Sequence, residues 1–268
     1  IFYERITAKT GFPFKGYFIP WERMGRKAMQ GADGVISITQ GMLEWGQNRF
    51  ARARNPADRV FYQSQSAAPV AEDMAFWTGK GINLDTPKTR LVWAGTLISD
   101  LDIQTLLDAI EALPESAAQE LEFVFCGSGD LSPRIEEMAS RLPHVIFGGW
   151  ASQGALTALY ARSHIGMMCY LDRFDFQLSI PNKVADFTRS NLRILTNLRG
   201  EMQRVLGPDD LLVPYPTGDV DALRLKLEEI AANPAIYRTP APKARALFDR
   251  LFDASAVMPE FAEYLEQI

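Results

Sequence analysis

The chain has 268 residues, of which 47% are hydrophobic and 23% are charged, as in globular proteins with one large or two modest domains. Because no apolar run approaches the roughly 20 residues of a membrane-spanning helix, we expect no such span. The net charge of −5 argues against a nucleic-acid-binding protein.

Charge is distributed unevenly along the chain. Residues 1–54 carry nine Lys or Arg against four Asp or Glu, whereas the remainder carries 19 against 29. A basic segment that is also rich in aromatic residues suits peripheral contact with a membrane surface or an anionic substrate. A solvated face without any partner accounts for the same residues equally well.

The first residues resemble a strand with no start signal before it. We therefore expect an upstream segment, and no secretory signal sequence, because charged residues appear as early as Glu4 and Arg5. Cys126 and Cys169 each end an apolar run that is typical of a buried strand. This placement predicts reduced core thiols and a cytoplasmic protein.

The first 85 residues are predicted to be the remainder of an N-terminal domain and a crossover. Its expected elements are an aromatic loop at 12–18, a helix at 21–30, a short buried strand at 35–39, a helix at 41–52, a strand at 58–62 and an irregular crossover at 63–87.

A regular pattern follows over residues 86–252, where apolar strands alternate with helices. The predicted strands are 91–94, 121–126, 145–147, 165–170, 192–196 and 211–213; the predicted helices are 103–113, 132–140, 152–161, a short helix opened by residues 179–182, one starting at 200, 220–232 and 242–252. This alternation predicts an α/β domain built on a Rossmann-type parallel sheet. Residues 253–268 are predicted to form a C-terminal helix that packs back on the N-terminal domain.

Glycine-bearing turns follow several of the predicted strands. Gly95, then Gly127-Ser128-Gly129, then Gly148-Gly149 each come directly after an apolar run. Ligands of parallel sheets bind at the carboxyl ends of the strands, and glycine lets backbone approach a ligand closely. Several such turns on one sheet edge predict a binding crevice, although each alone is also explained as a plain strand-to-helix turn.

A second signal lies at residues 175–196, where a polar loop leads into a short helix. Pro181 suits a first helical position, so we expect the backbone N–H groups of Ser179, Ile180 and Asn182 to form an anion site. Lys183 and Asp186 are three residues apart and share a face near this start. A cation and a carboxylate here suit a nucleotide sugar, whereas an ordinary surface ion pair is the alternative.

The order of these motifs resembles the retaining glycosyltransferases of family 4, which have the GT-B fold of two Rossmann-like domains. The resemblance rests on residues 32–39, 91–97 with 106–109, 123–129, 149–160 and 180–187. It implies that residues 86–252 bind a nucleotide-diphosphate sugar and that residues 1–85 are part of a second, acceptor-side domain. It further implies transfer to a glycan or lipid-linked acceptor in polysaccharide biosynthesis, without a metal or other cofactor.

The resemblance also assigns roles within the donor site. Lys183, and less strongly Arg189, are expected at the diphosphate, Asp186 at the ribose hydroxyls, and Trp150 beside the base. Thr96 is expected near the sugar or phosphate. Catalytic residues are not identified; His144 and His164 are expected to be structural, and Glu201 is given no catalytic role.

Three positions depart from the family pattern. Thr96 and Leu101 stand where its members usually carry an Arg and a Lys that bind diphosphate, and Leu178 stands where the first acid of its paired-glutamate motif belongs. Two alternatives therefore stay open beside the transferase. One is a catalytically silent GT-B-like binding protein, and the other is a GT-B enzyme such as a sugar-nucleotide epimerase.

Overall fold

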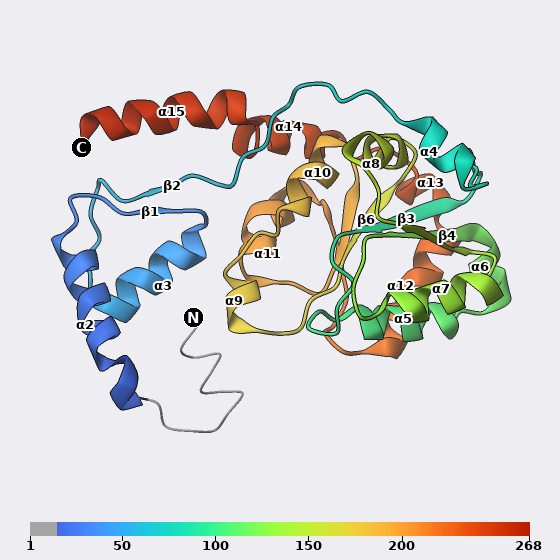
Figure 1. The fold of residues 1–268 in the computed structure, drawn as a ribbon, viewed down its shortest axis with the longest axis horizontal. Helices are drawn as coiled ribbons and strands as arrows, with labels where there is room; N and C mark the ends of the chain where they lie inside the picture. Colours follow the sequence, from blue (N-terminus) through green and yellow to red (C-terminus); the bar gives the residue numbers. More distant parts are fainter. Residues whose placement is uncertain (1–14) are drawn as a thin grey trace.

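A computed structural model describes residues 15–268, with side chains from Ile19 onward. Its larger part is a six-stranded sheet in the order β5-β4-β3-β6-β7-β8, in which every neighbouring pair is parallel (Figure 1). The strands are β3 (Thr89–Ala94), β4 (Leu121–Cys126), β5 (Val145–Gly149), β6 (Ile165–Met168), β7 (Arg193–Thr196) and β8 (Leu212–Pro214). The chain builds outward from β3 to β5 and then returns to start again at β6. This reversal creates a switch point, where parallel α/β sheets bind ligands.

Helices cover both faces of this sheet. One face carries α5 (Ile103–Glu111), α6 (Glu115–Glu120), α7 (Ser132–Arg141), α12 (Val220–Ala232) and α13 (Pro234–Tyr237); the other carries α4 (Met74–Gly79), α8 (Gln153–Tyr160), α10 (Lys183–Arg189), α11 (Gly200–Leu206) and α14 (Pro242–Leu251). Because both faces are covered, β3 and β4 are buried at every residue. Continuous apolar runs, rather than alternating ones, are what this geometry requires. The α/β fold with a Rossmann-type parallel sheet is thus confirmed.

The smaller N-terminal part consists of α2 (Lys15–Gly31), β1 (Ile36–Ser37), α3 (Gln40–Phe50) and β2 (Arg59–Val60), with β1 and β2 parallel. The predicted aromatic loop is wrong over residues 15–18, which belong to α2, and residues 12–14 lie outside the described residues. The predicted buried strand at 35–39 is also wrong in extent. It has one neighbouring strand, Ile36 and Ile38 are 40% and 46% exposed, and Thr39 already caps α3.

Short helices account for the remaining differences from the prediction. The crossover at 63–87 was expected to be irregular but contains α4, because Trp77 is fully buried there and donates through Nε1 to the Ala155 carbonyl at 2.9 Å. The helices α6, α9 (Phe174–Gln177) and α13 were not predicted either. Within the part of the chain that the structure describes, no helix is long and apolar enough to span a membrane.

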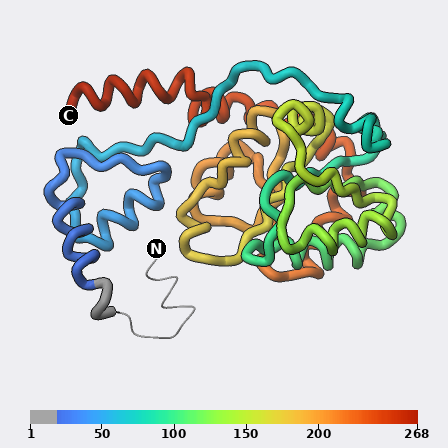
Figure 2. Tube along the Cα trace, viewed as in Figure 1, coloured from blue at the N-terminus to red at the C-terminus, as the bar shows by residue number. Residues whose placement is uncertain are grey.

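The C-terminal helix α15 (Ala254–Gln267) returns to the N-terminal part, as Figures 1 and 2 show. Phe61 and Phe261 have ring centroids 5.1 Å apart, and the Tyr264 hydroxyl donates to the Ala57 carbonyl at 2.5 Å. Just before it, Gln65 and Asp253 form a parallel bridge between the crossover and the segment that leads into α15. Two separate segments therefore connect the N-terminal part to the sheet.

A buried carboxylate joins the two parts at another place. Glu201, in α11, has a side chain that is 1% exposed, and it accepts hydrogen bonds from the backbone N–H groups of Gln40 at 3.1 Å and Gly41 at 3.0 Å. The Tyr62 hydroxyl donates to the same carboxylate at 3.2 Å. Anions stabilise helix N-termini, so Glu201 caps α3 from the opposite part of the molecule. We call this arrangement the Glu201 cap.

Candidate functional site

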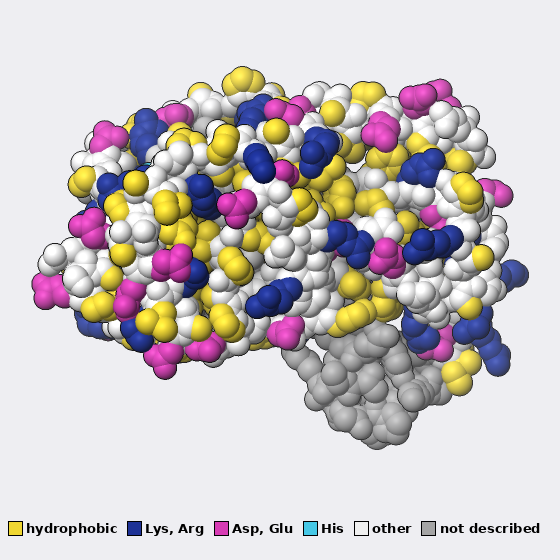
Figure 3. Space-filling model, turned by 180° about the vertical axis from the view of Figure 1, so that it is seen from behind, with side chains coloured by type: hydrophobic (Ala, Val, Ile, Leu, Met, Phe, Trp, Pro, Cys, Tyr) yellow, Lys and Arg dark blue, Asp and Glu magenta, His cyan; other side chains and the backbone are white. Residues whose placement is uncertain are grey.

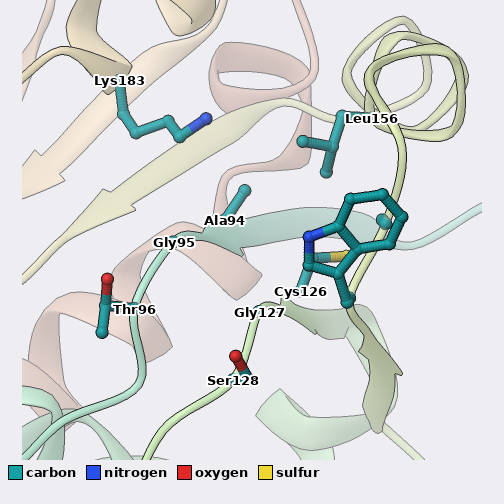
Figure 4. Close-up of a pocket in the computed structure, with 10 residues that line it drawn as sticks. Ala94, Gly95, Thr96, Cys126, Gly127, Ser128, Leu156 and Lys183 are labelled. Carbon is teal, nitrogen blue, oxygen red and sulfur yellow. The ribbon is translucent and has the colours of Figure 1, made fainter.

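A cavity of about 400 Å³ lies at the carboxyl ends of β3, β4 and β5 (Figure 4). It is lined by Ala94, Gly95, Thr96, Cys126, Gly127, Ser128, Trp150, Ala151, Leu156 and Lys183. In Figure 4, Lys183 enters from one side and Leu156 from the other, with Thr96 and Ser128 on the loops below. Six residues predicted to share a site are therefore brought together: Gly95, Thr96, Gly127, Ser128, Trp150 and Lys183. We call this space the strand-end cavity.

Glycine at position 127 is what lets the two loops pack so closely. Its φ is +137°, and a Cβ at that position would lie 1.8 Å from the Gly95 carbonyl oxygen. The loops are also joined to neighbouring strand ends: Gly95 N–H donates to the Cys126 carbonyl at 2.9 Å, and Gly127 N–H donates to the Gly149 carbonyl at 2.8 Å. The cavity floor is thus backbone rather than side chain, so a ligand can approach peptide groups directly.

Lys183 is the cation that reaches the strand-end cavity. It is the first residue of α10, its side chain is 35% exposed, and its ammonium lies 3.0 Å from a carboxylate oxygen of Asp186. Residues 179–182 lead directly into this helix, as predicted, and Asn182 already has the helical φ of −54° and ψ of −30°. The expectation that Pro181 is the first helical residue is wrong, because α10 begins at Lys183. Pro181 instead supplies the carbonyl that accepts from the Val184 N–H.

Asp186 and Arg189 border an adjoining cavity of about 270 Å³ between α8 and α10. Leu156 and Lys183 line both this cavity and the strand-end cavity, so the two are adjacent. The Arg189 guanidinium donates to the carbonyls of Ser66 and Ala68, which commits it to holding the crossover. Asp186 has a side chain that is 23% exposed, and its carboxylate pairs with Lys183.

The other predicted residues lie away from the strand-end cavity. Ile180 and Asn182 border a much smaller cavity beside Tyr62, between the two parts of the chain. The Ser179 hydroxyl donates to the Asp175 carbonyl within the preceding turn. Gly129 packs on Leu97, whose carbonyl oxygen would lie 2.1 Å from an added Cβ. Trp150, by contrast, lines the strand-end cavity, and 74% of its surface is exposed.

Four lining residues were not among the predicted site residues: Ala94, Cys126, Ala151 and Leu156. Cys126 is a free, buried cysteine, and burial raises the pKa of its thiol to about 12. At that pKa the thiol is uncharged near neutral pH and is not a nucleophile. Leu156 supplies an apolar wall from α8. The position of Cys126 directly before Gly127 is the sequence signal that would have placed it here.

Charge in the strand-end cavity is sparse. Lys183 is the one charged side chain among the described residues that line it, and Thr96 stands where an Arg is usual in the family that the sequence resembles. Leu101 is half-buried and packs on the apolar cluster beneath α5. Among the described residues, no group of three or more His, Cys, Asp or Glu is placed to hold a metal ion.

The two histidines occupy structural positions next to strands. His164 precedes β6, and its Nδ1 accepts the backbone N–H of Arg90 at 2.9 Å. Burial, followed by the positive charges of Arg238 and Arg90, lowers the pKa of His164 to about 4. The pKa of His144 is lowered by burial and then by Lys88. Both rings are therefore neutral near neutral pH.

The fold is that of GT-B glycosyltransferases, as solved structures of such enzymes show. Sucrose-phosphate synthase from Thermosynechococcus elongatus superposes with a TM-score of 0.69 at 16% identity, covering 92% of this chain and 61% of its own. Anabaena HepE, solved with UDP, gives 0.67 at 14% identity, covering 88% of this chain and 64% of its own. A glycosyltransferase from Rickettsia africae gives 0.70 at 12% identity, with coverages of 92% and 67%.

The chain therefore spans 61% and 64% of the first two of these proteins. No protein-family model matches the sequence. No curated protein sequence matches it either. The likeness in structure shows a shared fold.

Proposed function

We propose that this protein is a retaining glycosyltransferase that moves a sugar from a nucleotide-diphosphate donor to a glycan or lipid-linked acceptor. The observation that carries the proposal is the strand-end cavity itself, which has a backbone floor and one lysine, at the switch point of a GT-B sheet. Two of the similar structures support it: HepE was solved with UDP-glucose, and a pneumococcal O-GlcNAc transferase was solved with UDP and GlcNAc.

In this proposal the donor lies along the cavity with its diphosphate near Lys183. The peptide groups around Gly95 and Gly127 then lie beside the phosphates and sugar, and the Thr96 hydroxyl donates a hydrogen bond to one of them. Asp186, in the adjoining cavity, accepts hydrogen bonds from the ribose hydroxyls. Trp150 offers an exposed aromatic face for the base.

The chemical task is to stabilise negative charge on the departing nucleoside diphosphate. The Lys183 ammonium, in a partly desolvated cavity, would stabilise the negative charge that develops on the diphosphate in the transition state. Contact with the N-terminal part would bring the acceptor to the sugar and exclude water. No catalytic base or nucleophile is assigned to this chain.

One observation favours a second candidate, a GT-B-like protein that binds a nucleotide or glycan without turning it over. Lys183 is already paired with Asp186 at 3.0 Å. The other described residues that line the strand-end cavity supply no second cation for a diphosphate. A silent binder needs less charge stabilisation than a transferase, because no charge develops on a leaving group.

Calorimetric titration of the full-length protein with UDP-, GDP- and ADP-sugars tests both candidates. We expect one donor to bind and be turned over, and Lys183→Ala to lower turnover by at least about tenfold, since a charge-assisted hydrogen bond is lost. Lys243→Ala, at an exposed position of α14, is the matched control. Binding without turnover would support the silent binder, and unchanged turnover in Lys183→Ala would remove Lys183 from the donor site.

We propose further that the protein is cytoplasmic and contacts a membrane surface through α2. In this helix Trp21 and Met24 are 65% and 64% exposed, and Arg23, Arg26 and Lys27 lie among them. Figure 3 shows Lys and Arg side chains at this end of the molecule. Basic residues near aromatic ones favour anionic lipid interfaces. Sedimentation with vesicles should show binding to anionic but not to neutral lipid, weakened by Arg26→Glu. Equal binding to both kinds of vesicle would contradict this assignment.

A further inference from the structure

A second large cavity lies at the amino ends of the strands, whereas the strand-end cavity lies at their carboxyl ends. Its volume is also about 400 Å³, and its lining residues include Arg162, Ser163, His164, Ser190, Arg238 and Thr239. His164 directly precedes β6, and Ser190 lies shortly before β7, so this space opens at the amino ends of the strands. We call it the strand-start cavity. The proposed donor site does not include it.

The charges that line this cavity are all positive. Arg162 and Arg238 contribute guanidinium groups, and no Asp or Glu is among the lining residues. Each guanidinium is held in place by a contact that leaves donors available. Arg162 donates to Glu72 at 2.6 Å and lies 3.7 Å from Asp85. Arg238 donates through Nε to the Thr89 hydroxyl at 3.1 Å and lies 3.6 Å from Glu120. These three carboxylates do not line the cavity, and each is exposed enough for water to screen its charge. A planar guanidinium with free N–H groups matches the oxygens of a phosphate.

His164 adds a neutral donor of fixed orientation. Because Nδ1 accepts the Arg90 N–H, the ring proton lies on Nε2, at the other edge of the ring. Arg90 and Arg238 are the charged groups that act on this ring, and both are cations. Burial and then both cations disfavour the protonated imidazole, so the His164 ring is neutral, and both cations would be stabilised by an anion bound beside them.

The ends of two helices also meet here and need to be weighed. The helices α8 and α10 end at this cavity, and helix C-termini carry partial negative charge. Their last carbonyls are already paired, however. Arg162 donates to the Ala158 carbonyl at 3.0 Å, and the Ser190 N–H donates to the carbonyls of Asp186 and Phe187. Arg162 and Arg238 are therefore the charged side chains at this cavity that can bind an anion directly.

From these observations we propose that the strand-start cavity is a second ligand site that takes a small phosphate-bearing anion. Arg162 and Arg238 bind the phosphate oxygens, and His164 donates through Nε2. The site adjoins the donor side along α8 and α10, because Thr157 and Ser190 line both the strand-start cavity and the 270 Å³ cavity beside Asp186. A ligand here is therefore placed to influence α10, which begins at Lys183.

The chain offers a direct probe, because it contains only two histidines. We would titrate the full-length protein with inorganic phosphate and follow the two histidine Cε1–H signals by NMR. The expected result is a saturable shift of the His164 signal and a rise in its pKa, while the His144 signal stays still. Chloride at equal ionic strength should cause no such shift. A His164 signal that is unmoved by phosphate, or moved equally by chloride, would overturn the proposal.

Variants then separate this site from the donor site. Arg238→Gln should weaken the phosphate response about tenfold, because one charged partner is lost, whereas Arg245→Gln, at an exposed ion pair with Asp249, should not. If Arg238→Gln fails to fold, Arg238→Lys, which keeps the charge but loses the fork, should still weaken binding. Lys183→Ala should leave the His164 response intact. Loss of that response in Lys183→Ala would mean a single shared site and would refute the proposal.

Discussion

Removing the Glu201 cap should destabilise the whole protein rather than one part of it. In Glu201→Ala, three donors lose their acceptor: the N–H groups of Gln40 and Gly41 and the hydroxyl of Tyr62. A buried donor left without a partner costs about 1–3 kcal/mol. We take the lower figure for each, because the first turn of α3 is partly accessible to water, and expect a loss of about 3 kcal/mol.

For a chain of this size, 1 kcal/mol corresponds to about 2–4 °C in the unfolding midpoint, so the expected loss is about 6–12 °C. Glu201→Gln keeps one acceptor oxygen and should lose about half as much. Thermal and urea unfolding, followed by circular dichroism, measure both effects. Glu260→Ala, at an exposed position of α15, is the control and should change the stability by less than about 0.5 kcal/mol.

A double substitution tests whether Tyr62 and Glu201 stabilise the protein through the same hydrogen bond. Tyr62→Phe should destabilise the native protein but cost almost nothing in the Glu201→Ala background, because its acceptor is already absent. If Glu201→Ala unfolds at the native midpoint, or if the two substitutions are simply additive, the carboxylate does not hold α3 as described.

Two further predictions concern pH and the cavity floor. The pKa of His164 is lowered from 6.5 to about 4, so between these values the unfolded chain binds more protons and stability falls as the pH drops. His164→Gln should remove about 2 kcal/mol of that pH dependence, allowing for partial exposure; an unchanged slope in urea unfolding contradicts this. Gly127→Ala should cost at least about 3 kcal/mol, because its Cβ would meet the Gly95 carbonyl at a positive φ. Gly81→Ala is the control, because Gly81 has a φ of +71° but no atom near an added Cβ, so only backbone strain should act there and cost about 1 kcal/mol. Equal losses of stability at the two positions would show that the Gly127 Cβ does not clash with the Gly95 carbonyl.

The sheet could be predicted because its signals are local. Each strand from β3 to β7 is a short apolar run, and β3 and β4 lead directly into glycine turns, so sequence alone located the strands and the edge where a cavity forms. The short helices could not be found in this way. The helix α4 exists because Trp77 is buried against Ala155, a contact between residues 78 positions apart.

The candidate site was predictable to a similar degree. The strand-end rule brought Gly95, Gly127 and Lys183 to one cavity without any knowledge of side-chain contacts. It failed for Ser179 and Ile180, because Pro181 lies before the helix rather than inside it. Glu201 carried no local signal, since its partners in α3 lie 160 residues away.

The paired connections between the two parts restrict how those parts can move. The crossover passes Gln65 and the returning chain passes Asp253, and hydrogen bonds from Gln65 N–H to the Phe252 carbonyl at 2.7 Å and from Ala254 N–H to the Gln65 carbonyl at 2.8 Å tie them together. A single covalent tether permits rotation about any axis. Two chain segments that are hydrogen-bonded side by side can bend together, but they resist twisting and sliding relative to each other. The Glu201 cap is a further connection, so a swing of the N-terminal part toward the strand-end cavity has to break the hydrogen bonds from Gln40 and Gly41 to Glu201.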